Sequence, residues 1–149
     1  MSADPVCFLL VEDDDSHAEL VQMALADNQV SNRVDRVNDG EQALAYLRRE
    51  GHYADYPQPD VVILDLKLPK IDGHEVLAQL KTDHKLRAIP VVVLSTSAAK
   101  LDKAKAYYNH VNSYLVKPVG FGEFHQMIKD LARYWSVWNQ RPCQLPATH

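Results

Sequence analysis

Runs of apolar residues, set between polar segments, predict five strands along this chain. VCFLLV at 6–11 and VVIL at 61–64 are continuously apolar, which is typical of strands buried on both faces of a parallel sheet. VVVL, which follows Pro90, and SYLV at 113–116 predict two more strands. NRVDRV at 32–37 alternates polar and apolar residues instead, and this pattern predicts a half-buried strand near an edge of the sheet.

Between these runs, apolar residues recur at the spacing of one helix face. The pattern predicts helices over 17–28, 41–50, 74–83, 98–109 and 120–138, with Asp15 as the first N-cap and Gly51 as the residue that ends the second helix. Lysines interrupt the fourth helix, so its pattern is the weakest. Five strands that alternate with five helices predict an α/β fold, a parallel sheet with helices on both faces.

The composition limits the domain count, the partners and the compartment that we expect, but it does not indicate a reaction. The chain has 149 residues, and we expect one domain over 5–138 and a flexible tail over 139–149. The net charge is −4 without a basic block, which argues against general nucleic-acid binding. No signal peptide and no membrane-length apolar run is present, so we expect a cytoplasmic protein. Cys7, in an apolar strand, and Cys143, in the tail, form no disulfide or metal pattern.

Polar residues stand where four of the predicted strands end, and the edge strand contributes none. In chain order they are Glu12 and Asp13, Asp65, Ser95 or Thr96, and Lys117. Because the carboxyl ends of parallel strands lie at one edge of a sheet, we expect these side chains to converge. Each has an ordinary alternative when taken alone: an acid can cap a loop or a helix, and a lysine beside a proline can be a surface residue. Chance would place all of these residues at strand ends far less often than it would place any one of them there.

These residue types suit phosphoryl chemistry. Carboxylates around one point suit a hard divalent cation such as Mg²⁺, and a carboxylate can also attack phosphorus to give an acyl phosphate. An ammonium group and a hydroxyl would stabilise the phosphoryl oxygens. The chain has no GxxxxGK[ST] and no GxGxxG motif, so we do not expect it to hold a nucleotide directly.

Four segments together resemble the receiver domain of two-component response regulators, over roughly residues 5–135: LLVEDD, ILDLKLPKIDG, VVVLSTS and YLVKPV. The resemblance implies a flavodoxin-like (CheY-like) doubly wound fold with strand order 2-1-3-4-5. It also implies a role for each matching residue: Asp65 as phosphoacceptor, Glu12 and Asp13 as the acidic Mg²⁺ pair, the backbone carbonyl of Lys67 as a further metal ligand, Ser95 as switch hydroxyl, Lys117 as phosphate-binding lysine and Tyr114 as rotamer-switch aromatic. Ser95, where threonine is commoner, and the cationic Lys67 depart mildly from the family pattern.

A narrower resemblance points to the stand-alone regulators paired with bacterial phytochromes. The segments that support this resemblance are the loop EGHYADYPQPD, the runs PVVVLSTS and HVNSYLVKP, and an aromatic-rich last helix. It implies a photoreceptor histidine kinase as upstream partner. With no output domain expected, the signal would leave by docking to an unknown protein target, and the chain would accept phosphate without being a turnover enzyme.

Three alternatives remain open at this point. The chain could be a pseudo-receiver, which keeps the fold as a constitutive scaffold, or a phosphorelay shuttle. The intact set of site residues favours a working switch over the scaffold. A phosphatase of the haloacid-dehalogenase type would need a second aspartate two residues after Asp65, where the chain has Lys67.

The last helix carries more apolar surface than one face needs. One stripe is Phe121, Phe124, Ile128, Leu131 and Trp135, and a second set beside it is Met127, Tyr134 and Trp138. We expect this surplus to form a homodimer interface, extended by Tyr107 and Tyr108 of the preceding helix. The alternative is that Trp138 folds back onto its own domain. The seven histidines show no metal-ligand spacing, and we expect them to be surface residues.

Overall fold

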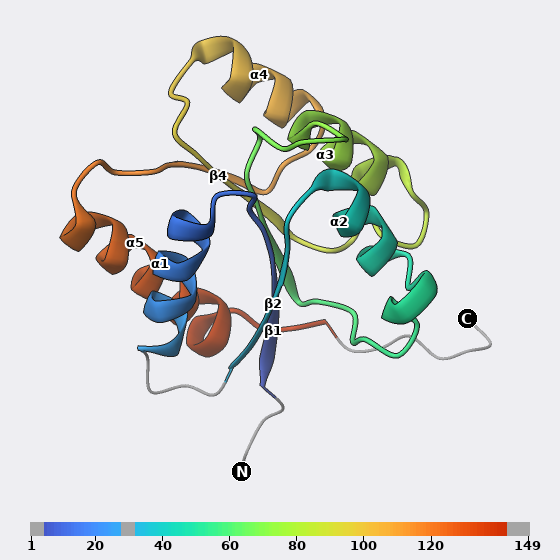
Figure 1. Cartoon of the computed structure of the whole chain (residues 1–149), viewed down its shortest axis with the longest axis horizontal. Coiled ribbons are helices and arrows are strands. Elements are labelled where there is room, and N and C mark those ends of the chain that lie inside the picture. The colour runs from blue at the N-terminus through green and yellow to red at the C-terminus, as the bar shows by residue number, and fades with distance from the viewer. Residues whose placement is uncertain (1–4, 28–31, 143–149) are drawn as a thin grey trace.

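Five strands lie side by side in one parallel sheet in the order β2-β1-β3-β4-β5, which confirms the expected topology. The computed structural model describes residues 5–27 and 32–142 (Figure 1). The strands are β1 Val6–Val11, β2 Asn32–Val37, β3 Val61–Leu64, β4 Val91–Ser95 and β5 Ser113–Val116. The helical elements are α1 Asp15–Ala26, α2 Gly40–Leu47, the 3-10 turn η1 Gly51–Tyr53, α3 Gly73–Thr82, α4 Lys100–Tyr108, α5 Phe121–Arg133 and the π-helical turn η2 Tyr134–Trp138.

The sheet separates two apolar cores, one under each layer of helices. Successive side chains of a strand point to opposite faces, so Leu9 and Val11 join the core that contains residues of α2, α3 and α4. Phe8 and Leu10, from the same strand, join the core under α1 and α5. Figure 1 shows α1 and α5 together on one side of the sheet and α2, α3 and α4 on the other. Burial on both faces explains why β1 and β3 are continuously apolar.

Two helix boundaries differ from those predicted. The N-cap of α1 is Asp14, whose carboxylate accepts a hydrogen bond from the backbone N–H of His17 at 3.1 Å, so the choice of Asp15 is wrong by one residue. Four consecutive acids gave no pattern that could separate the cap from its neighbours. α2 ends at Leu47, because Arg49 takes a left-handed φ of 56°, and Gly51 opens η1 instead of ending α2.

Two glycines let the loop between β3 and α3 pack closely against its surroundings. A Cβ atom on Gly73 would lie 2.5 Å from the carbonyl oxygen of Asp65, and one on Gly40 would collide with the carbonyl oxygen of Ile71. Any larger residue at either position would push this loop away from the end of β3. The loop matters because it directly follows Asp65.

The described residues contain no helix that is long and apolar enough to cross a membrane. Cys143 and most of the predicted flexible tail lie outside the described residues. Arg141, which belongs to the predicted tail, lies 3.5 Å from the carboxylate of Asp60 just before β3.

Candidate functional site

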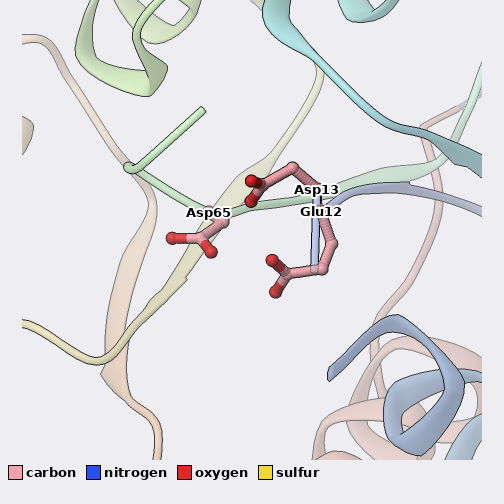
Figure 2. A group of neighbouring side chains, drawn as sticks. All are labelled: Glu12, Asp13 and Asp65. Atoms are coloured by element: carbon pink, nitrogen blue, oxygen red, sulfur yellow. The ribbon is translucent and has the colours of Figure 1, made fainter. Parts of the chain in front are cut away.

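Three carboxylates meet at the carboxyl ends of β1 and β3 (Figure 2). Glu12 and Asp13 follow β1, Asp65 follows β3, and one carboxylate oxygen of each lies within 4.8 Å of the others. Glu12 is 2% exposed and Asp65 9%, whereas Asp13 is exposed. The convergence that the strand ends predicted therefore occurs, and the cluster opens to solvent on the Asp13 side.

Lys117, from the end of β5, lies inside this cluster. Its Nζ donates to Oε1 of Glu12 at 2.6 Å, to Oδ2 of Asp65 at 3.3 Å and to Nδ1 of His17 at 2.9 Å. The Lys117 side chain is 3% exposed, so the alternative that it is an ordinary surface lysine is wrong. A buried ammonium needs such partners, since an unpaired charge in the interior is very costly.

The buried acid Glu12 shows how crowded the negative charges are. Burial is the main cause that raises the pKa of Glu12 to about 7, and the adjacent Asp65 carboxyl raises it as well. The ammonium of Lys117 acts in the opposite direction and lowers this pKa. One lysine thus compensates the carboxylates only in part, which leaves the cluster attractive to a further cation.

Arg36 of β2 supports the loop that carries the acidic pair. Its guanidinium donates two hydrogen bonds to the carbonyl oxygen of Glu12, at 3.0 and 2.8 Å, and lies 2.8 Å from the carboxylate of Asp15. On the other side of the site, the N–H of Lys67 donates to Oδ1 of Asp65 at 3.2 Å. The edge strand therefore adds no side chain to the acidic cluster, as expected, but Arg36 supports the backbone that carries it.

The expected switch residues meet at one loop residue. Ser95, fully buried at the end of β4, accepts a hydrogen bond from the N–H of Ser97 at 3.1 Å, and the hydroxyl of Tyr114 donates to the carbonyl oxygen of Ser97 at 2.8 Å. The hydroxyl of Ser97 also donates to Asp102 of α4 at 2.6 Å. This bond, together with one from His74, holds the pKa of Asp102 below its usual value. Ser97 therefore links both expected switch residues to α4.

Three histidines contradict the expectation that all of them are surface residues, and the third, His125, is half-buried on α5 beside Asp27. His74 is 7% exposed, and its Nε2 lies 3.2 Å from the carboxylate of Asp102. His17 is half-buried on α1 and contacts Lys117. None of these positions has the spacing of a metal site, and only the fold brings each histidine to its partner.

The donor set fits a hard divalent cation. The ligand atoms available at one point are carboxylate oxygens of Glu12, Asp13 and Asp65, which are the type that Mg²⁺ and Mn²⁺ prefer. No histidine or cysteine belongs to this cluster among the described residues, which argues against a zinc site. The backbone carbonyl of Lys67 remains a predicted further ligand.

Large apolar side chains are exposed at the end of the last helix. Tyr134, Val137 and Trp138 of η2 are 52%, 43% and 67% exposed, and we name them the C-terminal aromatic surface. Met127 is half-buried beside the core under α1 and α5. Phe121 does not belong to the buried stripe as predicted, since it is 60% exposed at the start of α5.

Tyr107 and Tyr108, at the end of α4, are also exposed. They line a cleft of about 500 Å³ together with Lys81 and its neighbours on α3. α4 and α5 pack on opposite faces of the sheet, one on each side of the edge strand β5. The extension of the dimer interface from the C-terminal aromatic surface to Tyr107 and Tyr108 stays a prediction.

Comparison with known proteins gives a consistent result. The response regulator receiver domain matches residues 8–129. The probable methanogenesis regulatory protein FilR2 of Methanothrix harundinacea is 47% identical over 140 residues, which are 93% of this chain and 89% of that protein.

Two solved structures are similar over nearly the whole chain. The phosphorylated cyanobacterial phytochrome response regulator RcpA has a TM-score of 0.90 and 43% identity, and the match covers 94% of this chain and 100% of RcpA. The Mn²⁺-bound form of the response regulator Rcp1, a protein of Synechocystis, has a TM-score of 0.89 and 37% identity, with 93% of this chain and 100% of Rcp1 covered.

Proposed function

The chain belongs to the family of response regulator receiver domains, and we propose that it is a phosphorylatable signalling switch whose phosphoacceptor is Asp65. The observation that carries this proposal is the position of Asp65, with its carboxylate 3.3 Å from the ammonium of Lys117 and beside two further acids. A scaffold without chemistry would have no need to bury this charged set, because buried charges cost stability. The geometry therefore favours the switch over the pseudo-receiver.

The chemical step is a transfer of one phosphoryl group to a carboxylate. An oxygen of Asp65 attacks the phosphorus of a phosphohistidine, the P–N bond breaks, and its electron pair returns to the imidazole of the donor. Lys117 offers an N–H to the phosphoryl oxygens, and Ser95 offers a hydroxyl. Mg²⁺, when held by Glu12, Asp13, Asp65 and the carbonyl of Lys67, supplies positive charge that neutralises those oxygens. The chain in this role is a phosphoryl acceptor and not a turnover enzyme.

The switch itself rests on the link between Ser95 and Tyr114. Movement of the Ser95 hydroxyl toward a phosphoryl group would break its hydrogen bond from the N–H of Ser97, the residue whose carbonyl oxygen binds the hydroxyl of Tyr114. The Tyr114 side chain would then have two environments, and their populations would differ between the phosphorylated and the free protein.

A histidine kinase is the proposed donor, and a phytochrome-type photoreceptor kinase is the proposed input. Two solved relatives, RcpA and the bacteriophytochrome response regulator RtBRR, are phytochrome response regulators by name and support this input. FilR2, which is 47% identical, is named as a probable methanogenesis regulator. Sequence similarity at this level therefore fixes the family, and the input must be tested with the kinase itself.

We also propose that the protein forms a homodimer through the C-terminal aromatic surface. Exposed aromatic side chains are enriched at protein interfaces, and a two-fold dimer would pair this surface with its copy. Docking to a downstream target or phosphate shuttling would then carry the signal onward.

The proposed function is tested by labelling with acetyl phosphate. Wild type with Mg²⁺ should gain the mass of one phosphoryl group, and EDTA should prevent this gain. Asp65→Asn, which keeps the shape of the side chain, should stay unlabelled. Equal labelling of Asp65→Asn, or labelling that ignores EDTA, would contradict the proposal.

A further inference from the structure

His17 lies beside the phosphoryl site and belongs to none of the roles assigned so far. Its Nδ1 is 2.9 Å from Nζ of Lys117 and 4.0 Å from Oε1 of Glu12. A lysine ammonium has three N–H donors and no acceptor, so Nδ1 of His17 must be the acceptor in this contact.

The three partners of Lys117 use all three of its N–H groups. Two of the contacts are short, 2.6 Å to Glu12 and 2.9 Å to His17, and the third, to Asp65, is 3.3 Å. With two N–H groups engaged by Glu12 and His17, the third is the one left for Asp65. This is the N–H that a phosphoryl oxygen on Asp65 would receive.

The backbone and the neighbouring ring hold His17 in place. Its N–H is bonded to the N-cap Asp14 at 3.1 Å, so the residue sits in the first turn of α1. Its ring lies 6.3 Å from the ring of Phe124 on α5. His17 also lines a cleft of about 320 Å³ with Lys117 and Thr96, which leaves its outer edge open to solvent.

From this geometry we propose that His17 is a positioning residue, which aims the ammonium of Lys117 at the phosphoryl group on Asp65. The proposal rests on the proposed function, since it assigns to Lys117 the role of phosphate ligand. Without the imidazole acceptor, the ammonium is free to turn toward Glu12 alone, and the N–H directed at Asp65 is no longer fixed. One well-placed hydrogen bond to a charged group then makes the difference between a preorganised and a mobile ligand.

Two variants of similar size separate positioning from packing. In His17→Asn the amide oxygen replaces Nδ1 as an acceptor, whereas His17→Leu fills the space without any acceptor. We expect His17→Leu to bind beryllofluoride, an analogue of the phosphoryl group, roughly fivefold more weakly than wild type in the presence of Mg²⁺. His17→Asn should bind it within about twofold of wild type.

A second readout does not depend on phosphoryl binding. In ¹H–¹⁵N spectra of the metal-free protein, the Lys117 ammonium should give a protected signal in wild type and in His17→Asn, and this signal should vanish in His17→Leu. Equal beryllofluoride affinity and an unchanged ammonium signal in His17→Leu would overturn the inference. Equal losses in both variants would do so as well, because they would indicate packing. If wild type binds no beryllofluoride, the proposed function fails, and the ammonium signal alone decides whether His17 orients Lys117.

Discussion

The phosphoryl site buries charged groups and gives each of them partners, whereas the C-terminal aromatic surface leaves large apolar groups exposed. Lys117 has three partners within 3.3 Å, and its side chain is 3% exposed. Trp138 is 67% exposed and Tyr134 52%. A buried charge without partners is strongly destabilising, so the first region must find its partners within one chain. Exposed aromatic rings are tolerated in a monomer, and the second region would gain a partner only in the proposed dimer.

The largest expected effect is on assembly. A double variant in which Glu replaces both Tyr134 and Trp138 should have a dimer roughly a hundredfold weaker or more, because large aromatic residues dominate interface energies. Light scattering should give the mass of two 16.9 kDa chains for wild type and of one chain for the variant.

The comparison for this prediction is Tyr108→Glu, which charges an even more exposed ring on α4, at the predicted margin of the interface. It should weaken the dimer less than the double variant does, and all three proteins should still accept phosphate. A monomeric wild type, or a dimer that survives both substitutions, would show that the aromatic surface is not the interface.

The next effect is on stability, and it contrasts the tight packing beside the phosphoryl site with the open packing at the start of α5, the helix that leads to the C-terminal aromatic surface. Gly73→Ala should cost about 2 kcal/mol or more, because the new Cβ would lie 2.5 Å from the carbonyl oxygen of Asp65. Gly122→Ala in α5 meets no atom within 4 Å and should stabilise by about 0.5 kcal/mol through helix propensity. Urea unfolding of both variants measures the difference. Equal stabilities would mean that the loop after β3 yields easily.

Metal affinity should fall by about tenfold in Asp13→Asn, which removes one carboxylate from the cluster. Asp14→Asn is the matched control, since it removes the same charge one residue later, and asparagine is an equally good N-cap. Its Mg²⁺ affinity should stay close to that of wild type. Titration with Mg²⁺, followed by NMR shifts, tests both. Comparable losses in the two variants would point to general electrostatic attraction instead of ligation.

The smallest effect concerns the switch. Ser95→Ala should still accept phosphate at Asp65, but the change in the Tyr114 environment should shrink by an amount that corresponds to about 1 kcal/mol, the value of one hydrogen bond. A fluorine label on Tyr114 reports its environment before and after phosphorylation. If the Tyr114 environment changes as much in the variant as in wild type, Ser95 does not control it.

The sequence was sufficient for the fold and for the residues at the strand ends. Continuous apolar runs set the buried strands, and parallel topology then forces Glu12, Asp65 and Lys117 to one edge. The gathering of these residues followed from the parallel direction of the strands, whereas the strand order came from the family resemblance.

The supporting residues could not be found in this way. His17 and Arg36 reach the site from a helix face and from the edge strand, and their side-chain directions depend on packing that no period in the sequence encodes. His74 meets Asp102 only because the fold brings α3 and α4 together. The N-cap of α1 was missed by one residue for a related reason, since four acids in a row are equivalent until the backbone selects one.

The most direct test of the central claim is to locate the acyl phosphate. The protein is labelled with acetyl phosphate and Mg²⁺, reduced with borohydride, which converts an aspartyl phosphate to homoserine, and sequenced by mass spectrometry. We predict homoserine at position 65 and unmodified Glu12 and Asp13. Reduction at either of those acids, or labelling without any reducible acyl phosphate, would contradict the account.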